Sequence, residues 1–188
     1  ELNEGGVERG VVELNRELVC LGIESIVISA GGRQADQIDL DGGRHIVFDV
    51  VSKNLLTAPG RMIQLRQLLR QLNPDILHAR SRVPAWLTFL ANRSLCVPFV
   101  TTVHGFNSVN AYSRVMTFGD RVICVSRSIE EHVQKHYGIP EEKTVVIPRG
   151  VDLELFNPDN VDREFVQGFK QRYQLDGQMV VASVGRIT

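Results

Sequence analysis

The chain has 188 residues, of which 43% are hydrophobic and 23% charged, proportions typical of a globular protein with a packed core. Its length allows one domain of ordinary size and part of a second. The formal net charge of −1 gives the whole surface no field that attracts nucleic acid, so we expect no nucleic-acid partner and only local basic sites.

The cysteines and the lengths of the apolar runs indicate the compartment. Cys20, Cys96 and Cys124 are far apart, lie beside apolar residues and lack CxxC spacing, which predicts buried free thiols instead of a disulfide framework or a zinc site. No apolar run approaches the ~20 residues needed to span a bilayer, and no signal peptide precedes the first predicted helix. We therefore expect a cytoplasmic protein.

Predicted helices and strands alternate along most of the chain. Apolar residues at helical spacing between Val7 and Leu21 predict a helix that opens at Gly5-Gly6 and is stopped by Gly22. The other predicted elements are strands at 23–29, 46–51, 75–79, 98–103, 121–125 and 143–147, a Gly- and Asp-rich loop at 30–43, and helices at 59–72, 84–93, 110–118 and 126–137. This alternation predicts an α/β fold, a Rossmann-like parallel sheet with helices on both faces.

Both ends depart from this pattern. No strand precedes the first helix, so we expect a truncated domain over 1–156 whose first strand is missing. Residues 157–188 predict a linker helix at roughly 161–173 and an apolar strand at 179–184, which resembles the opening strand of an otherwise absent second domain. We expect this strand to join a sheet edge, to pair between chains or to be poorly ordered.

Glycine and polar residues follow the predicted strands, where ligands bind in a doubly wound sheet. We call the edge of the sheet at the carboxyl ends of its strands the rim. The groups on the rim are Gly5-Gly6, His78–Arg82, His104–Asn107, Ser126 and Arg149–Asp152. Two glycines before a helix present N–H groups to a phosphate, although such a turn alone is a weak signal. The His78–Arg82 segment places three potential cations in five residues, which suits a phosphate or carboxylate unless the segment is simply a solvated loop.

The histidines and the remaining arginines divide into two classes. His104 follows a buried strand, and this position favours a group directed at substrate over a hydrogen-bonded core histidine. His45 is interpreted as a strand start, and His132 and His136 as a solvated helix face with no acidic or cysteine partner to complete a metal site. The three arginines of the 59–72 helix are assigned to a solvated face in preference to anionic lipid.

The motifs GGVERG, TVHGF, VICVS, VIPRGVDLELF and SVGR occur in this order and resemble glycosyltransferase family 4, the retaining enzymes of GT-B fold. The resemblance covers essentially the whole chain, and its most specific parts are the P-x-G-V-D…F element and VGR. DILHARSRVPAW and NAYSRVM resemble bacterial members associated with cell-envelope or lipopolysaccharide glycans. The resemblance implies an N-terminal, acceptor-side domain, with a second domain that holds most of a nucleotide-sugar donor.

The resemblance also implies roles for individual residues. Gly5 and Gly6 match the glycine loop beside the donor phosphates, and His104 matches the histidine that contacts the donor sugar near the reaction centre. Gly150 belongs to the inter-domain segment, and Arg186 matches an arginine that clamps the donor diphosphate. The weaker candidates for acceptor contact are His78, Arg80, Arg82 and Asn107.

In this family, arginine, lysine and helix N-termini stabilise the charge of the leaving diphosphate, so the resemblance implies no cofactor, no metal and no protein nucleophile. It also implies a glycan or lipid-linked acceptor and peripheral contact with the inner face of the cytoplasmic membrane. Arg149 stands where the family usually has asparagine, and it keeps a cation near the cleft. Because the chain ends before the expected lysine and paired glutamates, we expect it to be inactive alone.

Two alternatives remain open. One is a GT-B-fold relative with different chemistry, such as a sugar-nucleotide epimerase or a phosphorylase. The other is a non-catalytic domain that binds an anionic ligand through Arg80, Arg82 and Arg149.

Overall fold

The computed structural model describes residues 1–154 and 156–183, and the chain divides into two compact units, Glu1–Arg149 and Gly150–Thr188. The division falls just after Arg149, whereas the sequence placed the domain boundary after Phe156. The elements of the first unit are α1 (Gly6–Cys20), β1 (Ile26–Ser29), α2 (Ala35–Leu40), β2 (Arg44–Val47), α3 (Ala58–Leu72), β3 (Leu77–Ala79), α4 (Arg82–Asn92), β4 (Phe99–Val103), η1 (Ser113–Thr117), β5 (Arg121–Cys124), α5 (Arg127–Tyr137), η2 (Glu141–Lys143) and β6 (Thr144–Val146).

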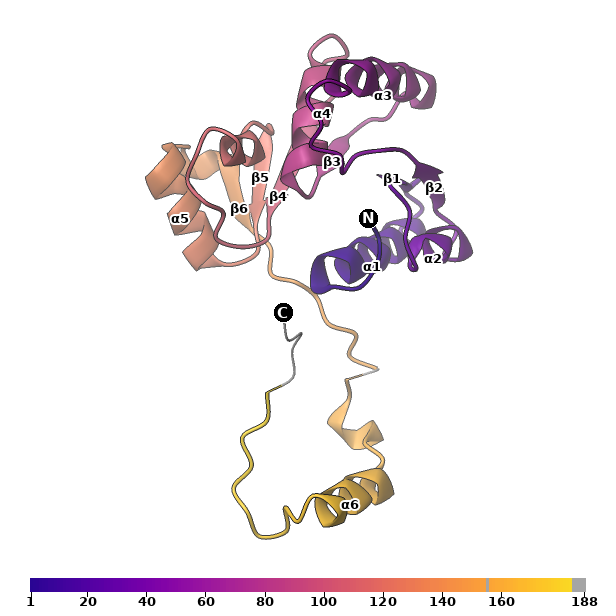
Figure 1. Cartoon of the computed structure of the whole chain (residues 1–188), viewed down its shortest axis with the longest axis vertical. Helices are drawn as coiled ribbons and strands as arrows, with labels where there is room; N and C mark the ends of the chain where they lie inside the picture. The colour runs from indigo at the N-terminus through magenta and orange to yellow at the C-terminus, as the bar shows by residue number, and fades with distance from the viewer. Residues whose placement is uncertain (155, 184–188) are drawn as a thin grey trace. The chain divides into compact units, whose positions relative to one another are not determined.

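Two parallel sheets organise the first unit, where the sequence predicted one (Figure 1). β1 pairs with β2, and β3, β4, β5 and β6 form a four-stranded sheet in the order of the sequence. In the larger sheet Ala79 lies opposite Thr101, and Val103 lies opposite Cys124. Because every pairing is parallel, the carboxyl ends of β3 to β6 lie along one edge. The predicted α/β fold with parallel sheets flanked by helices is confirmed.

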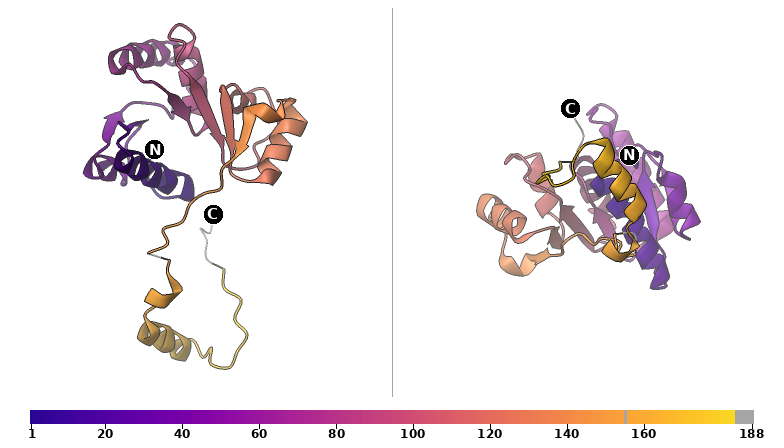
Figure 2. Two further views of the ribbon diagram at one scale, coloured as in Figure 1. Left: turned by 180° about the vertical axis from the view of Figure 1, so that it is seen from behind. Right: turned by 90° about the horizontal axis from the view of Figure 1, so that it is seen from below.

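The larger hydrophobic core surrounds the four-stranded sheet. Phe99 of β4, Val122 of β5, Leu65 of α3 and Ile129 of α5 are all buried in it. α3 and α4 lie side by side (Figure 2), so their apolar faces pack against each other as well as against the sheet. Strands covered in this way are rich in apolar and β-branched residues, which is why their positions could be predicted from the sequence.

The two-stranded sheet has a much smaller core. Its buried apolar residues are Leu2, Ala35 and Ile38. α1 contributes Asn15, whose Nδ2 donates to the carbonyl of Ile38 at 3.2 Å. A Cβ on Gly43 would collide with the Asn15 amide, so glycine is needed there for close approach. This part of the chain is therefore held by a thin and partly polar interior.

Several local predictions are wrong. The predicted loop at 30–43 contains α2, whose inward positions Ala35 and Ile38 are three residues apart on one helix face. β2 ends at Val47, because the Asp49 carboxylate accepts hydrogen bonds from the backbone N–H groups of Val51 and Ser52 and turns the chain. The helix predicted at 110–118 is a 3₁₀ helix over Ser113–Thr117.

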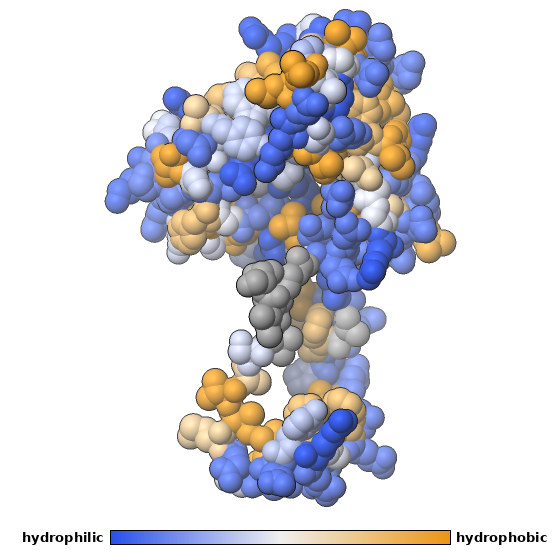
Figure 3. Space-filling model, in the orientation of Figure 1, coloured by the Kyte–Doolittle hydropathy of each residue, from blue (hydrophilic) through white to orange (hydrophobic). Residues whose placement is uncertain are grey.

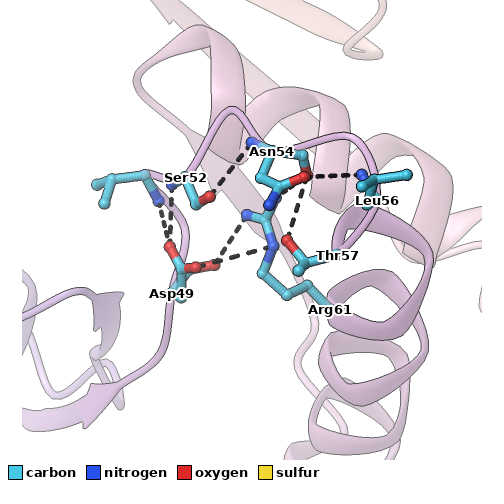
Figure 4. A network of polar contacts seen from close by, with 7 residues as sticks. Asp49, Ser52, Asn54, Leu56, Thr57 and Arg61 are labelled. Atoms are coloured by element: carbon cyan, nitrogen blue, oxygen red, sulfur yellow. Dashed lines mark hydrogen bonds and ion pairs between the residues drawn. The ribbon is translucent and has the colours of Figure 1, made fainter.

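The arginines of α3 also differ from the prediction of a solvated face. Arg61 is 8% exposed and donates to the carbonyls of Asp49 and Asn54 (Figure 4). Arg66 donates to the carbonyls of Leu90 and Ala91 at 3.2 Å each, where it satisfies acceptors near the end of α4. Only Arg70 of the three is exposed.

The prediction of three buried thiols holds for one cysteine. Cys20 and Cys96 are exposed, whereas Cys124 is buried. Burial, and to a smaller extent the charge of Glu130, raises the pKa of the Cys124 thiol to about 11. All three cysteines are free.

The second unit contains η3 (Pro158–Asn160) and α6 (Arg163–Arg172), with Asp162 as the N-cap of α6. The helix predicted at 161–173 is thus confirmed, but residues 179–183 form no strand; Val184 lies outside the described residues. Within the described parts of the chain, every helix is too short or too polar to cross a membrane.

Candidate anion-binding site

Four basic side chains gather at the carboxyl edge of the four-stranded sheet. His78 lies in β3, Arg80 directly after it, His104 directly after β4, and Arg149 at the end of the segment that follows β6. Nη2 of Arg149 lies 3.5 Å from Nδ1 of His104, and the charges of Arg80 and Arg149 both act on the His104 ring. The structure therefore brings together four of the residues singled out in the sequence. We call these four residues the cationic cluster.

One face of α1 lies against two of these arginines. A Cβ at Gly6 would lie 2.6 Å from Nη1 of Arg149, and a Cβ at Gly10 would lie 3.2 Å from Nη2 of Arg80. Positions 6 and 10 share a helix face because they are four residues apart. The glycines thus leave room for both guanidinium groups beside the positive N-terminal end of the helix.

Sequence reasoning missed Gly10, although its spacing from Gly6 in GGVERG was the available signal. Gly5, which was predicted, is the N-cap of α1 with φ +154°, a conformation that favours glycine. A Cβ at Gly5 would collide with the Glu8 carboxylate, so Glu8 contributes a negative charge next to the helix terminus.

Two nitrogen atoms of the cationic cluster are buried without a hydrogen-bond partner among the described residues, Nε of Arg80 and Nε2 of His104. Over residues 1–154 and 156–183, neither Arg80 nor Arg149 forms an ion pair with a carboxylate. Buried donors without protein acceptors are costly, and they suit a ligand that supplies several oxygen acceptors. The arrangement fits an anion such as a phosphate or diphosphate.

The two histidines of the cationic cluster are neutral at pH 7. Burial and then the charges of Arg80, Arg149 and His78 lower the pKa of His104 to about 4. Burial and then the Arg80 charge also lower the pKa of His78 to about 4, although the residue as a whole is exposed at the surface. Nε2 of His78 lies 2.7 Å from Oγ1 of Thr102.

The geometry also selects a tautomer for His104. A guanidinium can only donate, so Nδ1 of His104 must accept from Arg149, and the ring proton then lies on the buried Nε2. His104 is therefore suited to donate a hydrogen bond to a ligand oxygen, and it is a poor general base at neutral pH.

Other predicted site residues have different surroundings. Arg82 donates to Oγ of Ser113 at 3.3 Å, and its guanidinium carbon lies 5.4 Å from the centre of the Tyr112 ring. Asn107 lies three residues after His104 in the loop before η1. Gly150 begins the second unit, and Arg186 lies outside the described residues.

The remaining predicted residues are Ser126 and three histidines. Oγ of Ser126 accepts from the N–H of Ile129 and so caps α5. Nε2 of His45 lies 2.8 Å from Oγ of Ser29, consistent with a structural role. His132 departs from the predicted solvated face, because its Nε2 is buried and its ring packs edge-to-face with Phe106 at 5.1 Å. Within the described residues, no three His, Cys, Asp or Glu side chains are grouped so as to hold a metal ion.

Comparison with known proteins identifies the family. Residues 4–155 match Glycosyltransferase Family 4. The UDP-Gal:alpha-D-GlcNAc-diphosphoundecaprenol alpha-1,3-galactosyltransferase of Escherichia coli is 31% identical over 149 residues, which are 71% of this chain and 38% of that protein.

Solved structures agree on the fold. A glycosyltransferase from Rickettsia africae has 34% identity and a TM-score of 0.77, with 92% of this chain and 47% of that one covered. Anabaena HepE in complex with UDP and glucose has 16% identity and a TM-score of 0.70, with 91% of this chain and 47% of that one covered. The UDP-GlcNAc 2-epimerase of Neisseria meningitidis shares the fold alone. It has 15% identity and a TM-score of 0.60, with 89% of this chain and 52% of that one covered.

The chain spans about half the length of these structures and 38% of the E. coli relative. The match over residues 4–155 covers well over half of this chain. The chain thus belongs to glycosyltransferase family 4 and has the fold of the N-terminal domain of a GT-B glycosyltransferase.

Proposed function

We propose that the whole protein transfers a hexose from a nucleoside-diphosphate sugar to a glycan or lipid-linked acceptor with retention of configuration. This chain supplies the acceptor-side domain. The proposal is supported by the E. coli relative, whose name gives UDP-galactose as donor and a diphosphoundecaprenol-linked sugar as acceptor. The Anabaena neighbour, solved with UDP and glucose, supports a nucleotide-sugar donor.

The observation that carries the proposal is the cationic cluster beside the N-terminus of α1. Arg80 and Arg149 have no carboxylate partner within the described residues, and the glycines at 6 and 10 keep α1 close to both. In sugar transfer from a nucleotide-sugar, negative charge accumulates on the departing diphosphate. Fixed guanidinium groups and helix N–H groups stabilise that charge without reorganising during the reaction.

Each residue then has a distinct role in the proposal. Arg149 and Arg80 bind diphosphate oxygens, and Gly5 and Gly6 allow the backbone of α1 to approach them. His104 donates from Nε2 to an oxygen of the donor sugar, while Nδ1 of the same neutral ring accepts from Arg149. The acceptor hydroxyl attacks the sugar carbon from the same face that the diphosphate leaves, and the leaving phosphate takes the hydroxyl proton, so the proposal needs no nucleophilic side chain. Gly150 and Arg186 are proposed as further donor-binding residues, as the family resemblance implies.

His78, Arg82 and Asn107 are proposed to contact the acceptor. Their positions at the ends of β3 and β4 place them on the same edge as His104. A lipid-linked acceptor would require the protein to work at the cytoplasmic face of a membrane, as a peripheral protein.

The test is sugar transfer by the whole protein, with a panel of UDP-hexoses and a lipid-diphosphate-linked sugar as acceptor. We expect retained configuration in the product and a loss of at least about tenfold in kcat/KM for Arg80→Ala and His104→Ala. The matched control is Arg93→Ala, which removes an equal charge from an exposed arginine at the other end of α4 and should leave kcat/KM unchanged.

Two results would replace the proposal. Conversion of the donor to its epimer without transfer would favour an epimerase that shares the fold. Tight binding of an anion without any turnover of donors would favour a non-catalytic binding domain.

A further inference from the structure

The loop between β4 and η1, residues 104–112, is tied to two helices. Nε1 of Trp86 in α4 donates to the carbonyl of Tyr112 at 2.9 Å. The hydroxyl of Tyr137 in α5 donates to the carbonyl of Ser108 at 3.4 Å. The loop begins at the carboxyl edge of the four-stranded sheet, and these two contacts fix the course of its backbone there.

Phe106 extends from this loop into solvent and is held by a neighbouring ring. The residue is 69% exposed. Its ring packs edge-to-face with the ring of His132 in α5, with centroids 5.1 Å apart and planes at 88°. The His132 ring in turn lies 4.6 Å from that of His136, and its own Nε2 is buried. Phe106 therefore has a defined position without belonging to the core.

Position and neighbouring chemistry distinguish Phe106 from other exposed apolar residues. Such residues are common on protein surfaces, and on the face drawn in Figure 3 they form several separate areas within hydrophilic surface. Phe106 lies two residues after His104, and a Cβ on the intervening Gly105 would meet open space. Exposure alone thus does not mark Phe106 as a binding residue, whereas its place beside the cationic cluster does.

The loop differs in charge from the cationic cluster. Residues 105–113 contain no charged side chain, but they include two asparagines, two serines and a tyrosine. Amides and hydroxyls around an aromatic ring suit a neutral ligand with many hydroxyl groups, whereas the arginines of the cationic cluster suit an anion. Two chemically different subsites therefore meet at His104.

We infer that Phe106 is a stacking platform for a sugar ring of the acceptor and a determinant of acceptor specificity. The C–H groups on one face of a pyranose are apolar and slightly positive, so they pack on the negative face of an aromatic ring. Hydroxyls at the edge of that sugar can then bond to the amide of Asn107, the next residue in the loop.

The inference rests on the proposed function, because it assigns the loop to the second reactant of the same reaction. Arg80 and Arg149 are proposed to hold the donor diphosphate, and His104 the donor sugar. The uncharged loop beyond His104 is then left for the acceptor.

The test is titration of the 188-residue chain with octyl glycosides of neutral hexoses and N-acetylhexosamines, kept below their critical micelle concentrations. The backbone amide resonances of residues 105–109 report binding. We expect saturable binding of at least one glycoside, with shifts at Phe106 and Asn107. Phe106→Ala should weaken the affinity at least about fivefold, because the stacking contact is lost.

Two further variants separate stacking from simple apolar contact. Phe106→Tyr keeps the ring and should keep the affinity, whereas Phe106→Leu keeps an apolar side chain without a ring and should lose about as much as Phe106→Ala. None of these variants should change Tm, since Phe106 is exposed. The matched control is Phe165→Ala in α6 (Arg163–Arg172), because Phe165 is 68% exposed and should not affect the titration.

Three results would overturn the inference. They are no binding of any glycoside by the unmodified chain, equal affinity in Phe106→Ala and Phe165→Ala, and full affinity in Phe106→Leu.

Kinetics of the whole protein give a second measurement. Phe106→Leu should raise the KM for the acceptor and leave the KM for the nucleotide-sugar unchanged. A raised KM for the nucleotide-sugar alone would place Phe106 in the donor site and contradict the inference.

A titration with inorganic pyrophosphate separates this inference from the proposed function. Pyrophosphate should bind equally to the unmodified chain and to Phe106→Ala. Pyrophosphate binding without glycoside binding contradicts the stacking platform alone. Glycoside binding that depends on Phe106, without pyrophosphate binding, contradicts the proposed diphosphate site alone.

Discussion

The first 49 residues and residues 50–119 contrast within the same unit. The first segment carries ten acidic residues against four arginines, and its interior contains Leu2, Ala35 and Ile38 together with the polar Asn15. The second carries eight basic residues against one acidic residue and supplies most of the large core. Well-packed strands therefore position the arginine and histidine side chains, whereas a thinly packed segment contributes the helix terminus that faces them.

The largest expected effect is on the free energy of unfolding, and it tests whether the two segments share one core. Phe99→Ala should lower the free energy of unfolding of the first unit by about 3–5 kcal/mol, because Phe99 is 3% exposed and its loss leaves a cavity. Ile38→Ala should mainly weaken the segment from α1 to β2, which hydrogen exchange would detect as lost protection of its amides. If Ile38→Ala reduced protection equally in β4 and β5, the two segments would unfold as one unit and the contrast would fail.

A smaller effect concerns the charge of His104. The pKa of His104 in the folded chain is about 4, below the ordinary 6.5, so the unfolded chain binds more protons between these values. Stability should therefore fall as pH falls from 6.5 to 4, and His104→Asn should remove up to about 3 kcal/mol of that loss. His78, with Arg80 beside it, retains its own contribution in the variant.

Urea unfolding at pH 7 and pH 4.5 measures this prediction. The difference in free energy of unfolding between the two pH values should be smaller for His104→Asn than for the unmodified chain. An equal difference would place His104 outside the cationic environment described above.

The smallest expected effect comes from Gly10→Ala, which tests the contact between α1 and Arg80. Gly10→Ala should raise the free energy of unfolding by up to about 1 kcal/mol, because alanine favours the helix interior. Its Cβ would lie 3.2 Å from Nη2 of Arg80, so the guanidinium must shift and pyrophosphate affinity should fall severalfold. Calorimetric titration with pyrophosphate measures the affinity, and an unchanged affinity together with raised stability would show that Arg80 does not need its position beside α1.

Much of the first unit could be predicted from the sequence, because its strands are rich in apolar and β-branched residues and its helices have clear ends. α5 has such ends, because Oγ of Ser126 caps its first turn and Gly138 ends it in the left-handed conformation. α2 was missed because its six residues are too few to show a helical period and include two aspartates, whereas burial of Ala35 and Ile38 stabilises the helix. The inward course of Arg61 and Arg66 could not be predicted, since helical spacing does not reveal carbonyl acceptors on neighbouring segments.

The candidate site was predicted in part. The rim position identified His78, Arg80, His104 and Arg149, since parallel strands bring their carboxyl ends together. Sequence spacing gave no sign that Arg82 would contact Ser113 and Tyr112, because that depends on how the loop before η1 folds over α4. The role of Gly10 depends on the packing of α1 near β3, a contact distant in the sequence.

The most direct test of the central claim is calorimetric titration of the 188-residue chain with UDP and with inorganic pyrophosphate. The cationic cluster predicts saturable binding of both, weakened at least about tenfold by Arg80→Ala or Arg149→Ala and unchanged by Arg93→Ala. Absence of binding, or the same affinity in all three variants, would contradict a diphosphate site at this edge of the sheet.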